Sequence, residues 1–163
     1  MPPHITLRPI AEHDFALLRK IYAATREDLA LVPWDDAAKD AFLQQQFDAQ
    51  HTYYQKQFPQ AAFDLILWHN EPVGRLYVDR TEEELRIIDI ALLRDHRGQG
   101  IGGAIMSELL REAAKAGQVV RIHVLQGNRA GHLYERLGFS KIADTGVYDL
   151  MEWRAEEQAV PQG

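Results

Sequence analysis

The sequence predicts an α/β fold in which a mixed sheet of six to seven strands is flanked by about four helices. Seven short segments rich in β-branched and aromatic residues read as strands, and four longer segments repeat apolar residues at helical spacing. A chain of 163 residues can bury one sizeable core but not two. We therefore expect a single domain over residues 1–163, with an ordered core at about 4–154 and a polar tail at 155–163.

The first half of the chain predicts a strand, two helices and a hairpin. Apolar residues alternate, then recur at helical spacing in two segments separated by Pro33, and then alternate again on both sides of a turn. Asp35 or Asp36 can cap the second helix, and Pro59 lies just past its end. The other expected elements are a strand at 5–8, a helix at about 12–30, a turn at 69–72 and strands at 63–68 and 73–78.

The second half predicts the centre of the sheet. Residues 85–93 are apolar on both faces over most of their length, which is typical of a strand in the middle of a sheet. A glycine-rich loop and a core-facing helix follow, and Gly117 suits the residue just after that helix. The remaining elements are a strand at 119–125, a short helix stopped by Gly138, and strands near 140–142 and 147–153.

Composition excludes several function classes. The 18 Lys and Arg residues against 24 Asp and Glu residues leave a net charge of −6, which disfavours a nucleic-acid partner and mildly favours cationic substrates. Without cysteine there is no disulfide, thiolate metal site or cysteine acyl-enzyme. The seven histidines are scattered without ligand spacing, so we expect no metal. No signal peptide or membrane-spanning run is present, and we expect a cytoplasmic protein with no membrane partner.

The segment from Arg94 to Gly102 is the strongest candidate for a binding site. It joins the central strand to a helix, so unpaired backbone N–H groups at the helix N-terminus can attract phosphate. Its glycines allow the backbone to approach an anion closely, and Arg94 and Arg97 can add charge-assisted contacts. A solvated glycine-rich turn with two surface arginines would have the same sequence.

Two nucleotide-binding motifs compete for these glycines. Residues 98–103 match the dinucleotide pattern G-x-G-x-x-G, which requires an acidic residue about 20 positions further on. No Asp or Glu occurs between Glu112 and Glu135, so the dinucleotide interpretation fails. A P-loop is excluded because no Gly-Lys-Ser/Thr follows the glycines.

With a second motif, the loop resembles the GNAT superfamily of acetyl-CoA-dependent N-acetyltransferases. The family signature Arg/Gln-x-x-Gly-x-Gly/Ala is met by Arg97, Gly100 and Gly102. A second family element, an Asn before a short helix that carries Tyr and leads to Gly-Phe, is similar to residues 128–139. The resemblance covers the order of elements from about Ile5 to Trp153, but the first half is family-like in layout only. It implies a GNAT-like domain with a twisted, mostly antiparallel sheet.

The resemblance also implies the activity and the site residues. The chain would transfer an acetyl group from acetyl-CoA directly to a primary amine of a small molecule or peptide. Tyr134 would donate a proton to the departing CoA thiolate, although core packing alone could explain this tyrosine. Asn128 would bind the cofactor arm, although an ordinary helix cap has the same sequence. The other expected cofactor-binding residues are Ala91, Leu92 and Leu93 through their backbone, with Arg94, Arg97, Gly98, Gln99, Gly100, Ile101 and Gly102.

The amine acceptor needs a proton acceptor. A primary amine has a pKa of about 10.4 and must lose a proton before it attacks a thioester. Asp89 is the first candidate because it interrupts an otherwise apolar strand, and Glu84 or a water chain is the alternative. A structural carboxylate satisfied by the backbone or by an arginine would account for Asp89 equally well.

Two other function classes remain open from the sequence. One is a regulatory module that binds acyl-CoA without turnover, and the other is a nucleotide-binding protein that uses the same glycines. The sequence does not specify the acceptor or the oligomeric state, and a homodimer is compatible with it.

Overall fold

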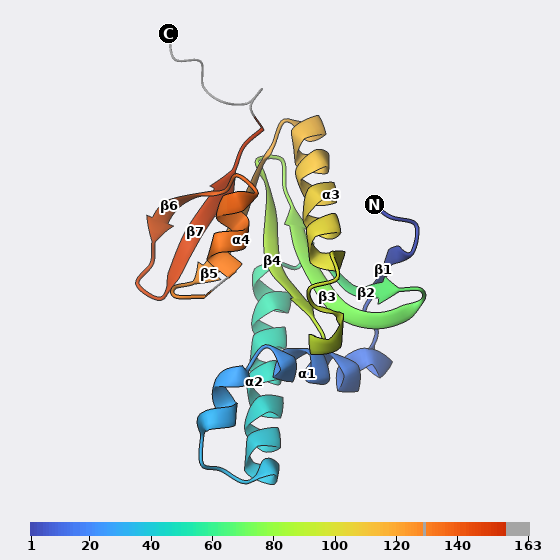
Figure 1. Ribbon diagram of the computed structural model, residues 1–163, viewed down its shortest axis with the longest axis vertical. Helices are drawn as coiled ribbons and strands as arrows, with labels where there is room; N and C mark the ends of the chain where they lie inside the picture. The colour runs from blue at the N-terminus through green and yellow to red at the C-terminus, as the bar shows by residue number, and fades with distance from the viewer. Residues whose placement is uncertain (129, 156–163) are drawn as a thin grey trace. The chain divides into compact units, whose positions relative to one another are not determined.

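The computed structural model describes residues 1–128 and 130–155 (Figure 1). The seven strands hydrogen-bond in the order β1-β2-β3-β4-β5-β7-β6. Among the described registers, β4 and β5 are parallel, and β1–β2, β5–β7 and β6–β7 are antiparallel. The predicted mixed, mostly antiparallel sheet with four α-helices is therefore confirmed. The elements are β1 Ile5–Pro9, α1 Phe15–Ala24, α2 Asp36–Gln57, β2 Ala62–Trp68, β3 Glu71–Arg80, β4 Glu84–Leu92, α3 Ile101–Ala116, β5 Val119–Leu125, α4 Ala130–Arg136, β6 Ser140–Asp144 and β7 Tyr148–Trp153.

The chain divides into two compact units. The first unit comprises Pro2–Tyr77 and Asp89–Gly102. The second comprises Met1, Val78–Ile88 and Gly103–Gly163. The expected polar tail lies almost entirely outside the described residues, which end at Ala155.

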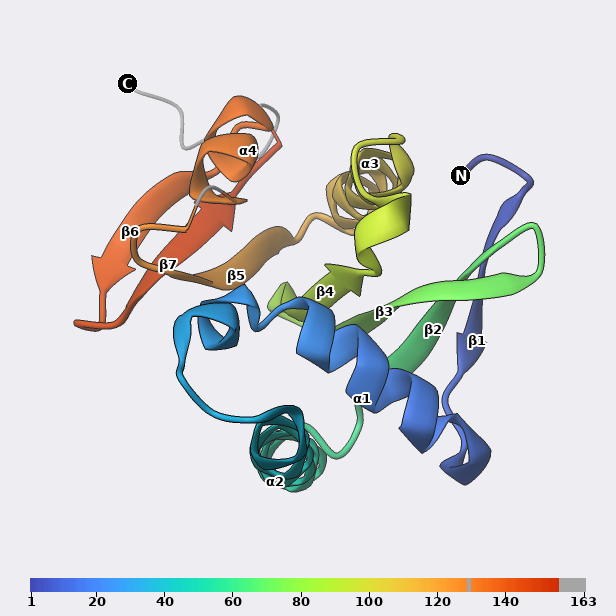
Figure 2. The ribbon, with the colours of Figure 1, turned by 60° about the horizontal axis from the view of Figure 1, so that its bottom comes forward.

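In the first unit, α1 and α2 lie on one face of β1, β2 and β3 (Figure 2). Apolar side chains from these helices meet the sheet and exclude water, which is the main source of stability for such a layer. The buried cluster consists of Leu18, Ile21, Tyr22, Phe47, Leu65 and Ala91.

The first helix is shorter than predicted. Instead of one helix at about 12–30, α1 is flanked by two 3₁₀ turns, η1 at Glu12–Asp14 and η2 at Glu27–Leu31. At the N-terminal end, the Asp14 carboxylate accepts a hydrogen bond from the Ala11 N–H at 2.8 Å. At the C-terminal end, the Thr25 hydroxyl donates to the Tyr22 carbonyl at 2.6 Å. Such local side-chain bonds compete with continued helix, so periodicity alone overestimated its length.

Local turn chemistry sets the start of α2 and the β2–β3 hairpin. The Asp35 carboxylate accepts from the Ala38 N–H at 2.7 Å, so Asp35 is the cap of α2. The hairpin turn contains only His69 and Asn70, with φ of 49° and 67°. Two successive positive φ values suit a two-residue turn, which is tighter than the predicted turn at 69–72.

In the second unit, β5, β7 and β6 follow one another in the sheet, and α4 covers one of their faces (Figure 2). Helix α3 buries Ile105, Met106 and Ala113, and it ends at Ala116, directly before Gly117, whose φ is 68°, as predicted. Among the helices of the described residues, none is long and apolar enough to cross a membrane.

Candidate active site

The loop between β4 and α3 has the predicted strand, turn and helix order. A 3₁₀ turn, η3 at Arg94–His96, follows β4, and α3 begins at Ile101. Gly98 and Gly100 have φ values of 74° and 84°, which residues with a Cβ rarely adopt. A Cβ at either position would meet no atom within 4 Å. The glycines are therefore needed for the course of the backbone, and the space in front of them is open.

Arg97 fastens this loop to the rest of the first unit. Its Nε donates to the Leu92 carbonyl at 3.1 Å, and its two terminal nitrogens donate to the Ala24 carbonyl at 2.7 Å and the Glu27 carboxylate at 3.1 Å. The Ala24 carbonyl lies at the C-terminal end of α1, where a cation is also favoured by the helix dipole. The guanidinium predicted to contact phosphate is thus engaged by the protein through all three nitrogens.

Arg94 is held less tightly. One nitrogen donates to the same Glu27 oxygen at 3.0 Å, and the Arg94 side chain is 71% exposed. The hydrogen bond from Arg97 and the charge of Arg94 lower the pKa of Glu27. Two arginines therefore share one carboxylate from η2, a residue for which the sequence had offered no role. Arg94 can turn to an anion at the cost of one exposed ion pair, whereas Arg97 would give up three contacts.

The other loop residues have distinct contacts. The Gln99 side chain donates to the Asp95 carbonyl at 3.1 Å and so closes the loop on itself. Ile101 is buried and anchors the start of α3. A Cβ on Gly102 would lie 3.9 Å from the nearest Leu92 side-chain atom, an ordinary contact. The N–H groups in the first turn of α3 have no intrahelical acceptor, as at any helix start.

The backbone at the end of β4 presents different groups to its two sides. The Leu93 N–H donates to the Val73 carbonyl of β3 at 2.8 Å. Because backbone groups alternate along a strand, the N–H and C=O of Leu92 point away from β3. The Leu93 N–H is therefore occupied within the sheet, and the Leu92 N–H is the outward donor of the predicted Ala91–Leu93 segment.

Gly74 on β3 is a site residue that the sequence interpretation missed. A Cβ at this position would lie 2.3 Å from the Ala91 carbonyl oxygen and 2.8 Å from a Leu92 side-chain carbon. Only glycine permits β3 to approach the end of β4 this closely. The available signal was an isolated glycine inside a strand, which often marks a close backbone approach.

Asp89 pairs with a buried arginine. The Arg75 side chain is only 2% exposed and donates both to Asp89 and, at 2.8 Å, to the Gln50 side chain. Burial tends to lower the pKa of Arg75, but the charge and hydrogen bond of Asp89 together with Tyr77 and Tyr54 raise it above its ordinary value. The guanidinium also lies 5.0 Å from the centre of the Tyr77 ring. The Asp89 contact is therefore that of a carboxylate satisfied by an arginine.

Tyr134, Asn128 and Glu84 belong to the second unit. Tyr134 is 6% exposed, and its ring centre lies 5.6 Å from that of Phe139. The Asn128 side chain accepts from the Ala130 N–H at 2.9 Å, a turn that leads into α4. Glu84 accepts hydrogen bonds from Arg86 at 3.0 Å and Arg121 at 3.1 Å, so two cations already occupy it.

The parallel register between β4 and β5 is short. It pairs Glu84 through Ile87 with Val119 through Ile122, although β4 continues to Leu92 and β5 to Leu125. Asp89 and the outward N–H of Leu92 thus lie on the part of β4 that follows this register. Within residues 1–128 and 130–155, no group of three or more His, Asp or Glu side chains is arranged to hold a metal.

One curated protein is similar in sequence to about half of this chain. The ribosomal protein bS18 alanine N-acetyltransferase of Haemophilus influenzae is 26% identical over 78 residues, which are 47% of this chain and 53% of the relative. The chain thus spans about half the length of that curated relative.

Solved structures with the same fold cover nearly the whole chain. The PaiA N-acetyltransferase of Thermoplasma acidophilum, in complex with coenzyme A, has a TM-score of 0.69 at 14% identity and covers 93% of this chain and 99% of its own. The ribosomal-protein-S18-alanine N-acetyltransferase of Escherichia coli has a TM-score of 0.62 at 18% identity, with 92% and 93% covered. The model of the acetyltransferase (GNAT) family matches residues 16–139, and the chain belongs to this family.

Proposed function

We propose that the chain moves an acetyl group from acetyl-CoA directly to a primary amine of a small molecule or peptide. The observation that carries this proposal is the loop at the end of β4, where Gly98 and Gly100 leave open space in front of α3. The same proposal treats residues 1–163 as one N-acetyltransferase domain that works in the cytoplasm.

The loop suits a pyrophosphate group. The N–H groups of the first α3 turn and the glycine backbone are donors for phosphate oxygens, and the exposed Arg94 can add a charged contact. Arg97 acts indirectly in this proposal, since its contacts with Leu92 and Ala24 hold the loop in shape. Gln99, Ile101 and Gly102 complete the loop, and Asn128 is proposed for the cofactor arm on the strength of the family motif. When bound, acetyl-CoA supplies the thioester whose acetyl carbon the amine attacks.

The backbone of β4 would stabilise the negative charge that develops on the acetyl carbonyl oxygen when the amine attacks. An amide N–H aimed at the carbonyl oxygen acts as an oxyanion donor. We assign this role to the Leu92 N–H, because the Leu93 N–H already donates to Val73. The backbone groups of Ala91 and Leu93 face β3 and would hold this part of the strand in place.

Proton transfer would involve both candidate catalytic residues. The Asp89 carboxylate is the counter-ion of the buried Arg75 guanidinium. We therefore propose that Asp89, whose side chain is 21% exposed, orders water that carries the proton away from the amine. Tyr134 would donate a proton to the thiolate, a role supported by its place in the family motif.

Binding of acyl-CoA without turnover is the competing function. The engagement of Asp89 by Arg75 favours it, because the contact gives this carboxylate a structural role without any part in chemistry. A nucleotide-binding protein would use the same glycines but has no support from the family match.

Two measurements on the purified chain separate these functions. Acetyl-CoA should raise the melting temperature while NAD and ATP should not, and free thiol should then be released when an amine is added. The amine panel should include a peptide that begins with alanine, because the similar enzymes of H. influenzae and E. coli are named for that acceptor. Stabilisation without thiol release from any amine would favour a binding module. No stabilisation by acetyl-CoA would refute both.

A further inference from the structure

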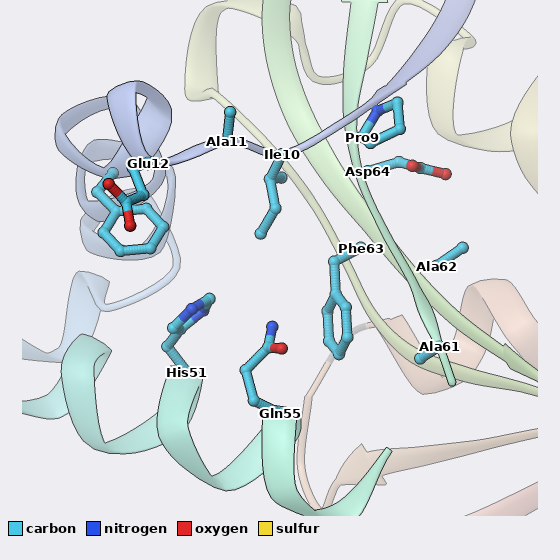
Figure 3. Close-up of a pocket in the computed structure, with 11 residues that line it drawn as sticks. Pro9, Ile10, Ala11, Glu12, His51, Gln55, Ala61, Ala62, Phe63 and Asp64 are labelled. Atoms are coloured by element: carbon cyan, nitrogen blue, oxygen red, sulfur yellow. The ribbon is translucent and has the colours of Figure 1, made fainter. Parts of the chain in front are cut away.

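A pocket lies in the first unit, and it shares no residue with the proposed cofactor loop (Figure 3). Its volume is about 580 Å³, within the range of roughly 300–1,000 Å³ that is usual for small-molecule sites. Its walls come from the end of β1 with η1, the start of α1, the C-terminal half of α2, and the start of β2. The lining residues are Pro9, Ile10, Ala11, Glu12, Phe15, His51, Gln55, Ala61, Ala62, Phe63 and Asp64.

The pocket has an apolar body. Ile10 and Phe63 point into it side by side (Figure 3), and the Ile10 N–H donates to the Phe63 carbonyl at 3.0 Å. Phe15 also lines the pocket. Figure 3 also shows His51 and Gln55 reaching into the same space from successive turns of α2. The His51 ring centre lies 5.0 Å from that of Phe15. These surfaces suit a flat or branched apolar group.

The charge of the pocket is negative. Glu12 and Asp64 line the pocket, and no Lys or Arg does. Arg8, which precedes the lining residue Pro9 in the chain, is paired with Asp14 through two hydrogen bonds of 3.0 Å. Burial lowers the pKa of His51, as does the charge of Arg75, so its imidazole is neutral near pH 7. A cation is therefore favoured over an anion.

Two polar side chains of the pocket, Gln55 and His51, can form directional hydrogen bonds with a ligand. The Gln55 amide and the His51 imidazole stand one helical turn apart on the same face of α2. The His51 Nδ1 is buried without a hydrogen-bond partner among the described residues. Fixed polar groups beside apolar walls are the usual means by which a pocket orients a small ligand.

We propose that this pocket binds a small amphipathic amine, with its apolar body against Phe15, Phe63 and Ile10 and its ammonium group toward Glu12. The proposal goes beyond acetyl transfer, because it assigns a ligand class to a site that contains none of the residues proposed for chemistry.

Direct binding without acetyl-CoA tests the proposal independently of catalysis. Isothermal titration calorimetry of the full chain would compare 2-phenylethylamine, its uncharged analogue 2-phenylethanol, and 1,4-diaminobutane, which has charge but no apolar body. We expect 2-phenylethylamine to bind more tightly than either of the others. Equal affinity for the amine and the alcohol, or no binding of the amine, would overturn the proposal.

Three variants locate the site. Glu12→Gln should weaken 2-phenylethylamine roughly fivefold, as for a partly exposed ion pair, and leave 2-phenylethanol unaffected. Ala61→Trp should fill the pocket and abolish binding of both. Glu71→Gln, an exposed carboxylate outside the lining, is the matched control and should change neither. Unchanged amine binding by Glu12→Gln, or retained binding by a folded Ala61→Trp, would place the ligand elsewhere and refute the assignment.

Discussion

Replacement of Gly74 by alanine should damage both stability and catalysis. The added Cβ would start 2.3 Å from the Ala91 carbonyl oxygen, and real Cβ contacts essentially never fall under 3.0 Å, so the strands must separate by at least about 0.7 Å. The contact is with backbone, which cannot rotate away as a flexible side chain would. Overpacking of this kind costs about 1–3 kcal/mol of unfolding free energy.

The same movement displaces the end of β4, which carries the proposed Leu92 oxyanion donor. Because a misplacement of about 1 Å can cost about 10²-fold in rate, we expect kcat/KM to fall by roughly 10- to 100-fold. Urea unfolding followed by circular dichroism would give the stability, and thiol release would give kcat/KM.

Gly103→Ala is the matched control for the stability measurement. It adds the same methyl group to α3 with no atom within 4 Å, so the helix should gain up to about 1 kcal/mol. If Gly74→Ala unfolded at the same urea concentration as the unaltered chain and kept its kcat/KM, the argument from the close strand approach would be refuted.

Three further predictions concern single side chains. Tyr134→Phe should lower kcat by about 10²-fold or more with little change in KM for acetyl-CoA. Tyr53→Phe, at a position that is 57% exposed, is the control. If Tyr134→Phe had the same kcat as the unaltered chain, Tyr134 would have no part in the mechanism. Arg97→Lys should raise KM for acetyl-CoA by about tenfold in the thiol assay, because an ammonium cannot replace three separate guanidinium contacts. An unaltered KM would contradict the proposal that Arg97 holds the loop in shape. The hydrogen bond from Arg8 lowers the pKa of Asp14, so its stabilising effect is complete above the ordinary carboxyl pKa of about 3.9 and is lost as pH falls through the lower folded value. The unfolding free energies of the unaltered chain and Asp14→Asn should therefore converge in acid, and a difference that stayed constant down to about pH 2 would contradict this pairing.

Elements whose signals are local could be predicted from the sequence. The apolar run of β4, the glycines before α3 and the terminating Gly117 act through their own backbone or through near neighbours, and the structure has each in its predicted place. The length of the first helix could not be predicted in the same way, because its end depends on Thr25 and on a guanidinium from the distant loop.

Site details depended on partners that are remote in sequence. Glu27 meets Arg97 across 70 positions, and no local pattern marks either as the partner of the other. Asp89 stood out as a polar residue in an apolar strand, but only the pairing of strands brings Arg75 beside it. The sequence could therefore nominate the residues of the loop, while their division into structural supports and exposed donors required the fold.

The buried pair of Arg75 and Asp89 also constrains how this chain can evolve. Loss of Asp89 alone would strand the Arg75 charge in the core at a cost of about 3–5 kcal/mol, whereas apolar residues of similar volume at both positions can be neutral or stabilising. The two positions are thus separated from an apolar alternative by intermediates of low fitness. Any lineage that abandons the pair must change both codons almost together, so among descendants of this sequence the two residues should be inherited or replaced as a unit.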